Sequence, residues 1–164
     1  MKPLEDKVLL AREFALKALA ARDQTRKELI ERLINKRFSA IIAEAAILQL
    51  EELGMLDDRR TAAEYIRTRL AGGPVARSLL ETELLERGLE PGLVQTVLHD
   101  ALEGQDEESE ALELARDKVR RSPARLSPDD IRRRAFAFLI RRGFDEETAR
   151  QAVETASEEY LGRP

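Results

Sequence analysis

The sequence lacks cysteine and tryptophan, and it contains only five phenylalanines and two tyrosines in 164 residues. Without cysteine the chain can form neither a disulfide bond nor a thiolate metal site. Nowhere do 18 apolar residues follow one another, which excludes an ordinary membrane-spanning helix. The N-terminal segment is charged at Lys2, Glu5, Asp6 and Lys7 and lacks the apolar core of a signal peptide. We therefore expect a cytoplasmic protein with no membrane association.

Few residues are suited to catalysis or metal binding. His99 is the only histidine, so no cysteine or second histidine can join it as a metal ligand. Asp57 and Asp58 are adjacent, so their side chains diverge, and we interpret them as helix caps rather than an acid–base pair. The segment Gly72-Gly73-Pro74 matches no phosphate-binding glycine pattern. The sequence predicts no catalytic residue, no metal and no cofactor.

The apolar residues that are present are mostly leucine, alanine, isoleucine and valine, while charged residues make up 37% of the chain. The charged residues fall between the apolar positions at the spacing of an amphipathic helix. This composition predicts an all-α fold. The length admits one compact domain or a short array of small units.

One pattern occurs three times along the chain. Each copy contains a turn made of a basic residue, then Gly or Arg, then an aromatic residue or Leu. The turns are Lys36-Arg37-Phe38, Arg87-Gly88-Leu89 and Arg142-Gly143-Phe144. Apolar positions around the turns superpose, and a repeat near 50 residues is typical of stacked helical units. We predict an elongated array of three tandem three-helix units, about nine helices in all, at residues 1–56, 57–104 and 105–164.

Signals for helix ends support this division. Thr25 and Glu28 form a Thr-x-x-Glu capping box, in which each residue bonds a backbone N–H of the other. Pro74 is expected at a first helical position. The polar segment Glu103–Glu110 is the best candidate for a flexible joint. Further helix N-caps are expected at Ser39, Ser127 and Asp145.

Charge is organised although the net charge is only −4. In every unit the first two helices are basic and the third is acidic; residues 114–142, for example, hold ten basic and three acidic residues. Stacked units would therefore carry a basic stripe able to attract an acidic partner. The alternative is that each run of charge is a solvated helix face stabilised by pairs one turn apart.

The order and spacing of several short motifs resemble those of the RecX family, regulators of the bacterial RecA recombinase. The resemblance spans Ala11 to about Tyr160, and its most specific motifs lie at the unit junctions. These are Leu53-Gly54-Met55-Leu56-Asp57-Asp58, Gly73-Pro74 with Arg87-Gly88, and Leu139-Ile140-Arg141-Arg142-Gly143-Phe144. Arg37 departs from the family, which commonly has Gly there, so the second helix must end through a non-glycine residue.

The resemblance implies a protein that binds the RecA filament on single-stranded DNA and inhibits RecA ATPase and strand exchange in recombination and DNA repair. We expect it to be a monomer. Whether the protein also makes a weak direct contact with DNA stays an open question at this point. An array of units could engage several weak contacts at once. We expect the basic helices to provide the contact surface, with the partner-binding residues Arg77, Arg87, Arg132, Arg133, Arg141 and Arg142.

Two other functions fit the sequence. Short helices joined by a glycine turn also occur in nucleic-acid-binding domains, so the chain could bind DNA without RecA. It could also be a generic helical-repeat adaptor for another protein. The absence of a catalytic pattern makes an enzyme the weakest of the alternatives.

Overall fold

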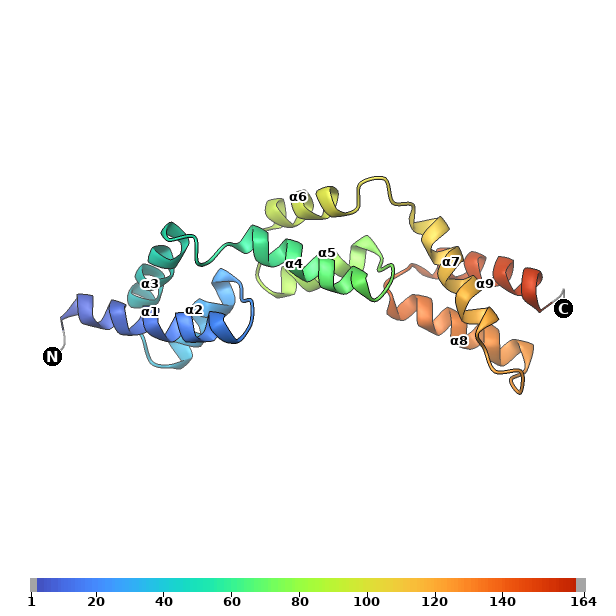
Figure 1. Ribbon diagram of the computed structural model, residues 1–164, viewed down its shortest axis with the longest axis horizontal. Helices are drawn as coiled ribbons and strands as arrows, with labels where there is room; N and C mark the ends of the chain where they lie inside the picture. Colours follow the sequence, from blue (N-terminus) through green and yellow to red (C-terminus); the bar gives the residue numbers. More distant parts are fainter. Residues whose placement is uncertain (1–2, 162–164) are drawn as a thin grey trace. The chain divides into compact units, whose positions relative to one another are not determined.

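The computed structural model of the protein describes residues 3–161. Within that range it contains nine α-helices and no β-strand (Figure 1), which confirms the all-α fold class. The helices are α1 (Leu4–Ala21), α2 (Arg26–Asn35), α3 (Ala40–Glu52), α4 (Asp58–Ala71), α5 (Arg77–Glu86), α6 (Pro91–Ala101), α7 (Glu107–Arg120), α8 (Pro128–Arg141) and α9 (Glu146–Tyr160). Over these same residues, no helix combines the length and the apolar character needed to cross a membrane. The predicted first and third units include residues 1–2 and 162–164, which lie outside the described part of the chain.

The chain separates into two compact bodies. The N-terminal body comprises Met1–Ile66 and Glu83–Val97, and the C-terminal body comprises Arg67–Thr82 and Leu98–Pro164. The boundary passes through α4, α5 and α6, so each of these helices contributes to both bodies. The division into three units at residues 56 and 104 stays a prediction from the sequence.

Buried alanines line the helix contacts in each body. In the N-terminal body α1 buries Ala11 and Ala15 and packs against α3, which buries Ala43. In the C-terminal body α7 buries Ala111 and Ala115 and packs against α9. A spacing of four residues places both alanines on one helix face, and their short side chains allow the helices to approach closely. Larger fully buried side chains of the N-terminal body include Leu29, Leu33, Ile47 and Leu50.

Local sequence signals set most of the helix starts. The Thr25 hydroxyl oxygen accepts a hydrogen bond from the Glu28 N–H at 3.2 Å, and the Glu28 carboxylate accepts one from the Thr25 N–H at 2.9 Å. The predicted capping box at the start of α2 is therefore confirmed. The remaining predicted N-caps are also confirmed, at Ser39, Ser127 and Asp145.

The three repeated turns share one backbone geometry. The central residue lies in the left-handed region, with φ of +70° at Arg37, +80° at Gly88 and +87° at Gly143. In each turn this residue's N–H donates to the carbonyl three residues earlier, and the next N–H donates to the carbonyl five residues earlier. This is the Schellman motif, which satisfies carbonyls that a helix end leaves open. Helix α2 thus ends through a non-glycine residue, as the sequence predicts.

Two boundary predictions are wrong. Pro74 does not begin a helix: α5 begins at Arg77, and the loop carbonyl of Pro74 instead accepts a hydrogen bond from Arg142, 68 residues away. The predicted joint Glu103–Glu110 is shorter than expected because α7 already begins at Glu107. Asp106 caps this helix, and carboxylates in a first turn are stabilised by the positive end of the helix dipole. The acidic segment that we interpreted as flexible is therefore partly a helix start.

Candidate partner-binding site

The six arginines proposed for partner binding fall into two groups. Arg87 and Arg142 occupy repeated turns, where their guanidinium groups bond to other parts of the chain. The others lie on helices, with Arg77 at the start of α5 and three arginines on or at the end of α8.

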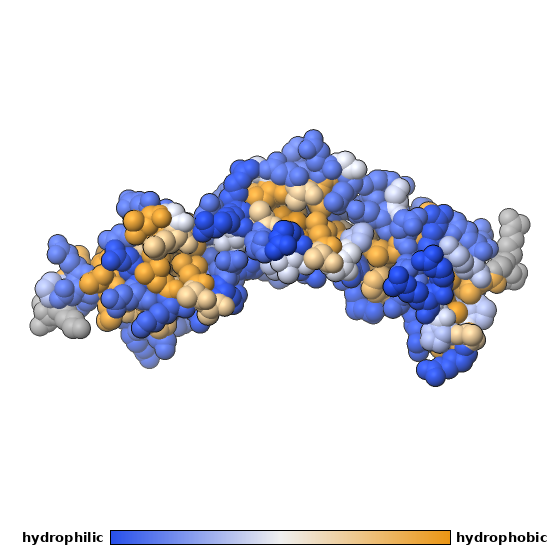
Figure 2. Space-filling model, in the orientation of Figure 1, coloured by the Kyte–Doolittle hydropathy of each residue, from blue (hydrophilic) through white to orange (hydrophobic). Residues whose placement is uncertain are grey.

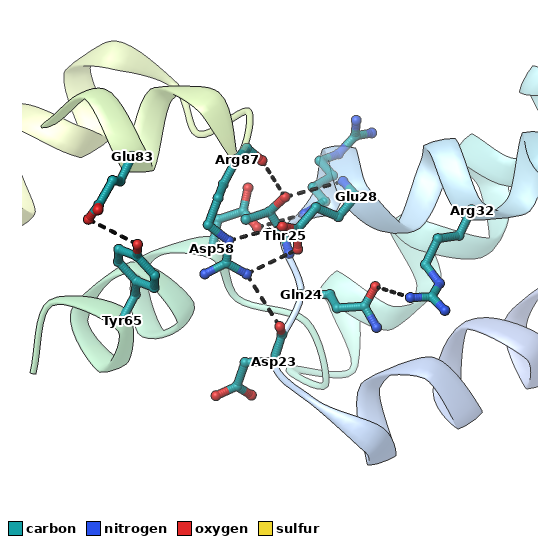
Figure 3. A network of polar contacts seen from close by, with 10 residues as sticks. Asp23, Gln24, Thr25, Glu28, Arg32, Asp58, Tyr65, Glu83 and Arg87 are labelled. Carbon is teal, nitrogen blue, oxygen red and sulfur yellow. Dashed lines mark hydrogen bonds and ion pairs between the residues drawn. The ribbon is translucent and has the colours of Figure 1, made fainter. Parts of the chain in front are cut away.

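Arg87 directly follows α5, and its side chain lies against the start of α2 in the N-terminal body, as Figure 3 shows. Its backbone carbonyl accepts a hydrogen bond from the Thr25 hydroxyl at 2.7 Å. Its guanidinium donates to both carboxylate oxygens of Glu28, from Nε at 2.9 Å and from Nη2 at 3.0 Å. Nη2 also approaches the carbonyl oxygen of Asp23 at 3.3 Å, and the guanidinium lies 5.2 Å from the centre of the Tyr65 ring. The capping residues of α2 therefore also hold the turn that follows α5.

Electrostatics follow from this geometry. Although burial raises the pKa of Glu28, hydrogen bonds from the Arg87 guanidinium and the Thr25 N–H outweigh it and hold that pKa below its usual value. The hydrogen bond to Glu28 in turn raises the pKa of Arg87. Only 17% of the Arg87 side chain and 21% of the Glu28 side chain is exposed, so solvent screens this ion pair less than one at the surface. The pair therefore links the turn after α5 to the start of α2.

Further polar groups complete the network in Figure 3. Asp58, the first residue of α4, accepts a hydrogen bond from the backbone N–H of Arg26 at 2.8 Å. It therefore caps the N-terminus of α2, although it belongs to another helix. Burial raises the pKa of Asp58. Its neighbour Asp57 accepts from the Arg60 N–H at 3.1 Å and caps α4. Our interpretation of the Asp57–Asp58 pair as caps is confirmed, although the two carboxylates cap different helices.

Arg142 occupies an equivalent place in the C-terminal body. Its carbonyl accepts a hydrogen bond from the Ala76 N–H at 3.0 Å, just before α5. Its guanidinium donates to loop carbonyls, from Nη1 to Gly73 at 3.0 Å and Pro74 at 3.2 Å, and from Nη2 to Gly72 at 2.5 Å. Arg142 therefore holds the loop before α5 as Arg87 holds the start of α2.

The central glycines show why the turns fit so closely. A Cβ atom on Gly88 would lie 2.1 Å from the side chain of Lys27 in α2, and a Cβ on Gly143 would lie 2.4 Å from Leu79 in α5. Both distances are too short for a side chain. Sequence reasoning identified the repeated turn but missed that its basic residue in the second and third copies, Arg87 and Arg142, binds to a segment earlier in the chain. The constant Arg-Gly order in the second and third turns was the available signal.

Of the remaining proposed arginines, Arg133 and Arg141 are exposed and Arg77 and Arg132 are half-buried. Two of the four pair within α8. Arg132 pairs with Asp129 at 3.0 Å, and Arg133, with 78% of its side chain exposed, pairs with Asp130 at 2.5 Å. The backbone N–H of Arg77 donates to the Glu107 carboxylate at 2.7 Å. Pairs of this kind are weak and easily exchanged for contacts with a partner. A role of these residues in partner binding remains a prediction.

Arg141 lines a groove that the sequence did not reveal. The groove lies between α7 and α8, has a volume of about 470 Å³, and is also lined by Ser122, Pro123 and Leu126 of the loop between these helices. Leu114, Leu126 and Phe138 are among its apolar lining residues, and Lys118, Arg121, Arg134 and Arg141 are its basic ones. We call it the α7–α8 groove. Hydrophilic side chains dominate the face of the C-terminal body shown in Figure 2.

A second exposed surface is apolar. Helix α3 buries Ile42, Ile47 and Leu50, as expected, yet Ile41 is 76% exposed and Leu48 is 52% exposed. Figure 2 shows apolar surface over this part of the N-terminal body. Exposed apolar side chains gathered on a helix are typical of surfaces that contact another protein.

The described residues contain no group of three or more His, Asp or Glu side chains arranged to hold a metal ion. His99 lies exposed on α6, away from any such arrangement.

Comparisons with known proteins agree with the repeat. Residues 11–50 match the family model described as RecX, first three-helix domain, and residues 106–153 match the model described as RecX, third three-helix domain. A protein named "Regulatory protein RecX" from Mycobacterium ulcerans is 33% identical over 145 residues, which cover 87% of this chain and 82% of the relative. One of the same name from Chlorobaculum tepidum is 32% identical over 159 residues, covering 97% and 96%. The crystal structure of RecX from Lactobacillus salivarius shares the fold at 18% identity, with a TM-score of 0.70 over 93% of this chain and 98% of that one.

Proposed function

The chain belongs to the RecX family of regulatory proteins, and on that premise we propose that it binds the RecA nucleoprotein filament and inhibits RecA ATPase and strand exchange. It acts as a binding protein without catalytic chemistry of its own. Because its proposed partner is a filament on DNA, the protein acts in the cytoplasm, and it acts there as a monomer.

The surfaces of the two bodies support this proposal. The α7–α8 groove presents basic side chains beside apolar ones, and α3 presents exposed Ile41 and Leu48. Two different surfaces on one chain suit a partner with many copies of the same binding site, because several weak contacts made together give high avidity. A filament is such a partner.

The observation that carries the proposal is the match to RecX relatives over nearly the full chain. The direct test is RecA ATPase on single-stranded DNA, titrated with this protein. We expect the ATPase rate to fall as the protein is added, at substoichiometric ratios if one bound chain affects several RecA protomers. An unchanged rate at a molar excess of this protein would refute the proposal.

Direct DNA binding is the second candidate, favoured by the basic stretch from Leu114 to Arg142. It predicts tight binding to single- or double-stranded DNA in the absence of RecA. The logarithm of the binding constant would then fall steeply with the logarithm of salt concentration, since each neutralised phosphate releases counterions. A salt titration against labelled oligonucleotides separates this candidate from RecA-dependent action.

A further inference from the structure

The α7–α8 groove is formed by matching faces of two helices. On α7 its lining residues are Leu114, Asp117 and Lys118, and on α8 they include Arg134 and Phe138. The lining residues of α8 recur at positions 134, 137, 138 and 141, and those at the end of α7 at 114, 117, 118 and 121. This i, i+3, i+4, i+7 spacing defines one face of each helix. The groove therefore follows one face of each helix over about two turns.

Basic side chains predominate among the charged residues that line the groove. Four basic side chains line it, and Asp117 is the only acidic one. The Asp117 carboxylate is already engaged by Arg120 and Arg121, each at 2.9 Å. By contrast, no hydrogen bond or ion pair within residues 3–161 engages the side chain of Arg134 or Arg141. These two exposed guanidinium groups are available to bind carboxylates from outside, each with two parallel hydrogen bonds.

The apolar part of the groove argues for a protein rather than a nucleic acid. Leu114, Leu126 and the neighbouring aliphatic groups offer space for aliphatic side chains. The Phe138 ring could in principle stack on a base, but two cations already lie against it: Lys118 Nζ at 4.9 Å and the Arg142 guanidinium at 5.4 Å from the ring centre. Binding of single-stranded nucleic acid usually depends on free aromatic faces. The combination of aliphatic pockets and free arginines instead matches an amphipathic acidic segment.

We propose that the α7–α8 groove is the docking site for an acidic protein segment that carries aliphatic side chains at helical spacing. The segment's carboxylates pair with Arg134 and Arg141, while its aliphatic side chains enter the space beside Leu114 and Leu126. The inference rests on the proposed function for the identity of the partner, so the segment belongs to the protein component of the filament and not to its DNA.

The absence of cysteine allows a direct test. Ser122→Cys places one thiol at the edge of the groove, and Glu158→Cys places one on an exposed part of α9 outside it. Each variant is labelled with a benzophenone maleimide, bound to RecA filaments on single-stranded DNA, and irradiated. We expect the label at position 122 to crosslink to RecA, within an acidic segment identified by mass spectrometry. The label at position 158 should give far less crosslinking.

Charge removal provides a second readout. Arg134→Gln with Arg141→Gln should reduce both the crosslink yield at position 122 and the affinity for filaments about fivefold, since two exposed charge contacts are lost. Arg22→Gln with Arg37→Gln removes the same charge from exposed residues of the N-terminal body, outside the groove, and should change the affinity by less than about twofold. Circular dichroism and thermal melting of every variant test whether its fold is intact.

The outcomes separate the two proposals. If the unmodified protein neither binds nor inhibits RecA, the proposed function fails, and the choice of partner fails with it. If it inhibits RecA but the label at position 122 reacts only with DNA, or with neither component, the docking proposal alone is wrong. Equal affinity of the Arg134/Arg141 variant and its control would also overturn the docking proposal while leaving the proposed function intact.

Discussion

Replacing Arg87 with methionine tests whether this arginine stabilises the fold or is available to bind a partner. Methionine keeps most of the length of the side chain but removes three hydrogen bonds, two to Glu28 at 2.9 and 3.0 Å and one to the Asp23 carbonyl at 3.3 Å. A hydrogen bond to a charged group contributes about 1.5–3 kcal/mol when buried. These groups are partly exposed, so we expect Arg87→Met to lower the free energy of unfolding by about 2 kcal/mol.

The assay is urea unfolding of the full chain, followed by circular dichroism. Arg133→Met is the matched control, because Arg133 is 78% exposed and has one ion pair within its own helix. It should cost about 0.3 kcal/mol. A double-mutant cycle with Glu28→Gln isolates the pair, and we expect a coupling energy of about 1–1.5 kcal/mol between positions 28 and 87.

Acidification gives an independent check on the same pair. The pKa of folded Glu28 is lowered, so its contribution to stability is complete above the unfolded value of about 4.3 and is lost as the pH falls through the lower, folded pKa. The stability difference between the wild-type chain and Arg87→Met should therefore shrink between pH 6 and pH 3. The reasoning is refuted if Arg87→Met costs no more than Arg133→Met, or if the difference grows on acidification.

Two further predictions concern the left-handed turn residues. Gly143→Ala should lower the free energy of unfolding by more than about 2 kcal/mol, because its Cβ would lie 2.4 Å from Leu79 in addition to the cost of positive φ. Gly54→Ala is the matched control with φ of +66° and no atom within 4 Å of the new Cβ, so it should cost only about 1 kcal/mol; equal losses would show that packing at the turn is unimportant. Arg37→Gly should raise stability by about 1 kcal/mol and the melting temperature by about 3 °C, because glycine adopts φ of +70° without strain. Thermal melting measures this change, and a lower melting temperature would contradict it.

The helix starts and the repeated turns could be predicted because they depend on residues close in sequence. The capping box of Thr25 and Glu28 is closed within four residues, and each Schellman turn within six. The errors at Pro74 and Glu103–Glu110 have a different origin. Pro74 lies in a loop whose carbonyls bind the side chain of Arg142, and a contact 68 residues away leaves no local signal.

The candidate site was less accessible to sequence reasoning. The basic character of the third unit was visible in the composition, and Arg141, one of the arginines proposed from the sequence for partner binding, is exposed. Arg87 and Arg142 looked equally available, yet their guanidinium groups are engaged by the chain itself. Sequence alone counts charges, but it does not show which of them already have a partner.

The sequence by itself therefore determined the helices, their caps, the repeated turns and the family, since backbone hydrogen bonds in helices and turns join residues only a few positions apart. Only the tertiary structure decided which arginines are occupied and which remain free. It also brought the basic and apolar faces of α7 and α8 together, although Lys118 and Arg134 are separated by a loop and lie on different helices. Such side-chain contacts join residues that are far apart in the sequence, so no local sequence pattern predicts them.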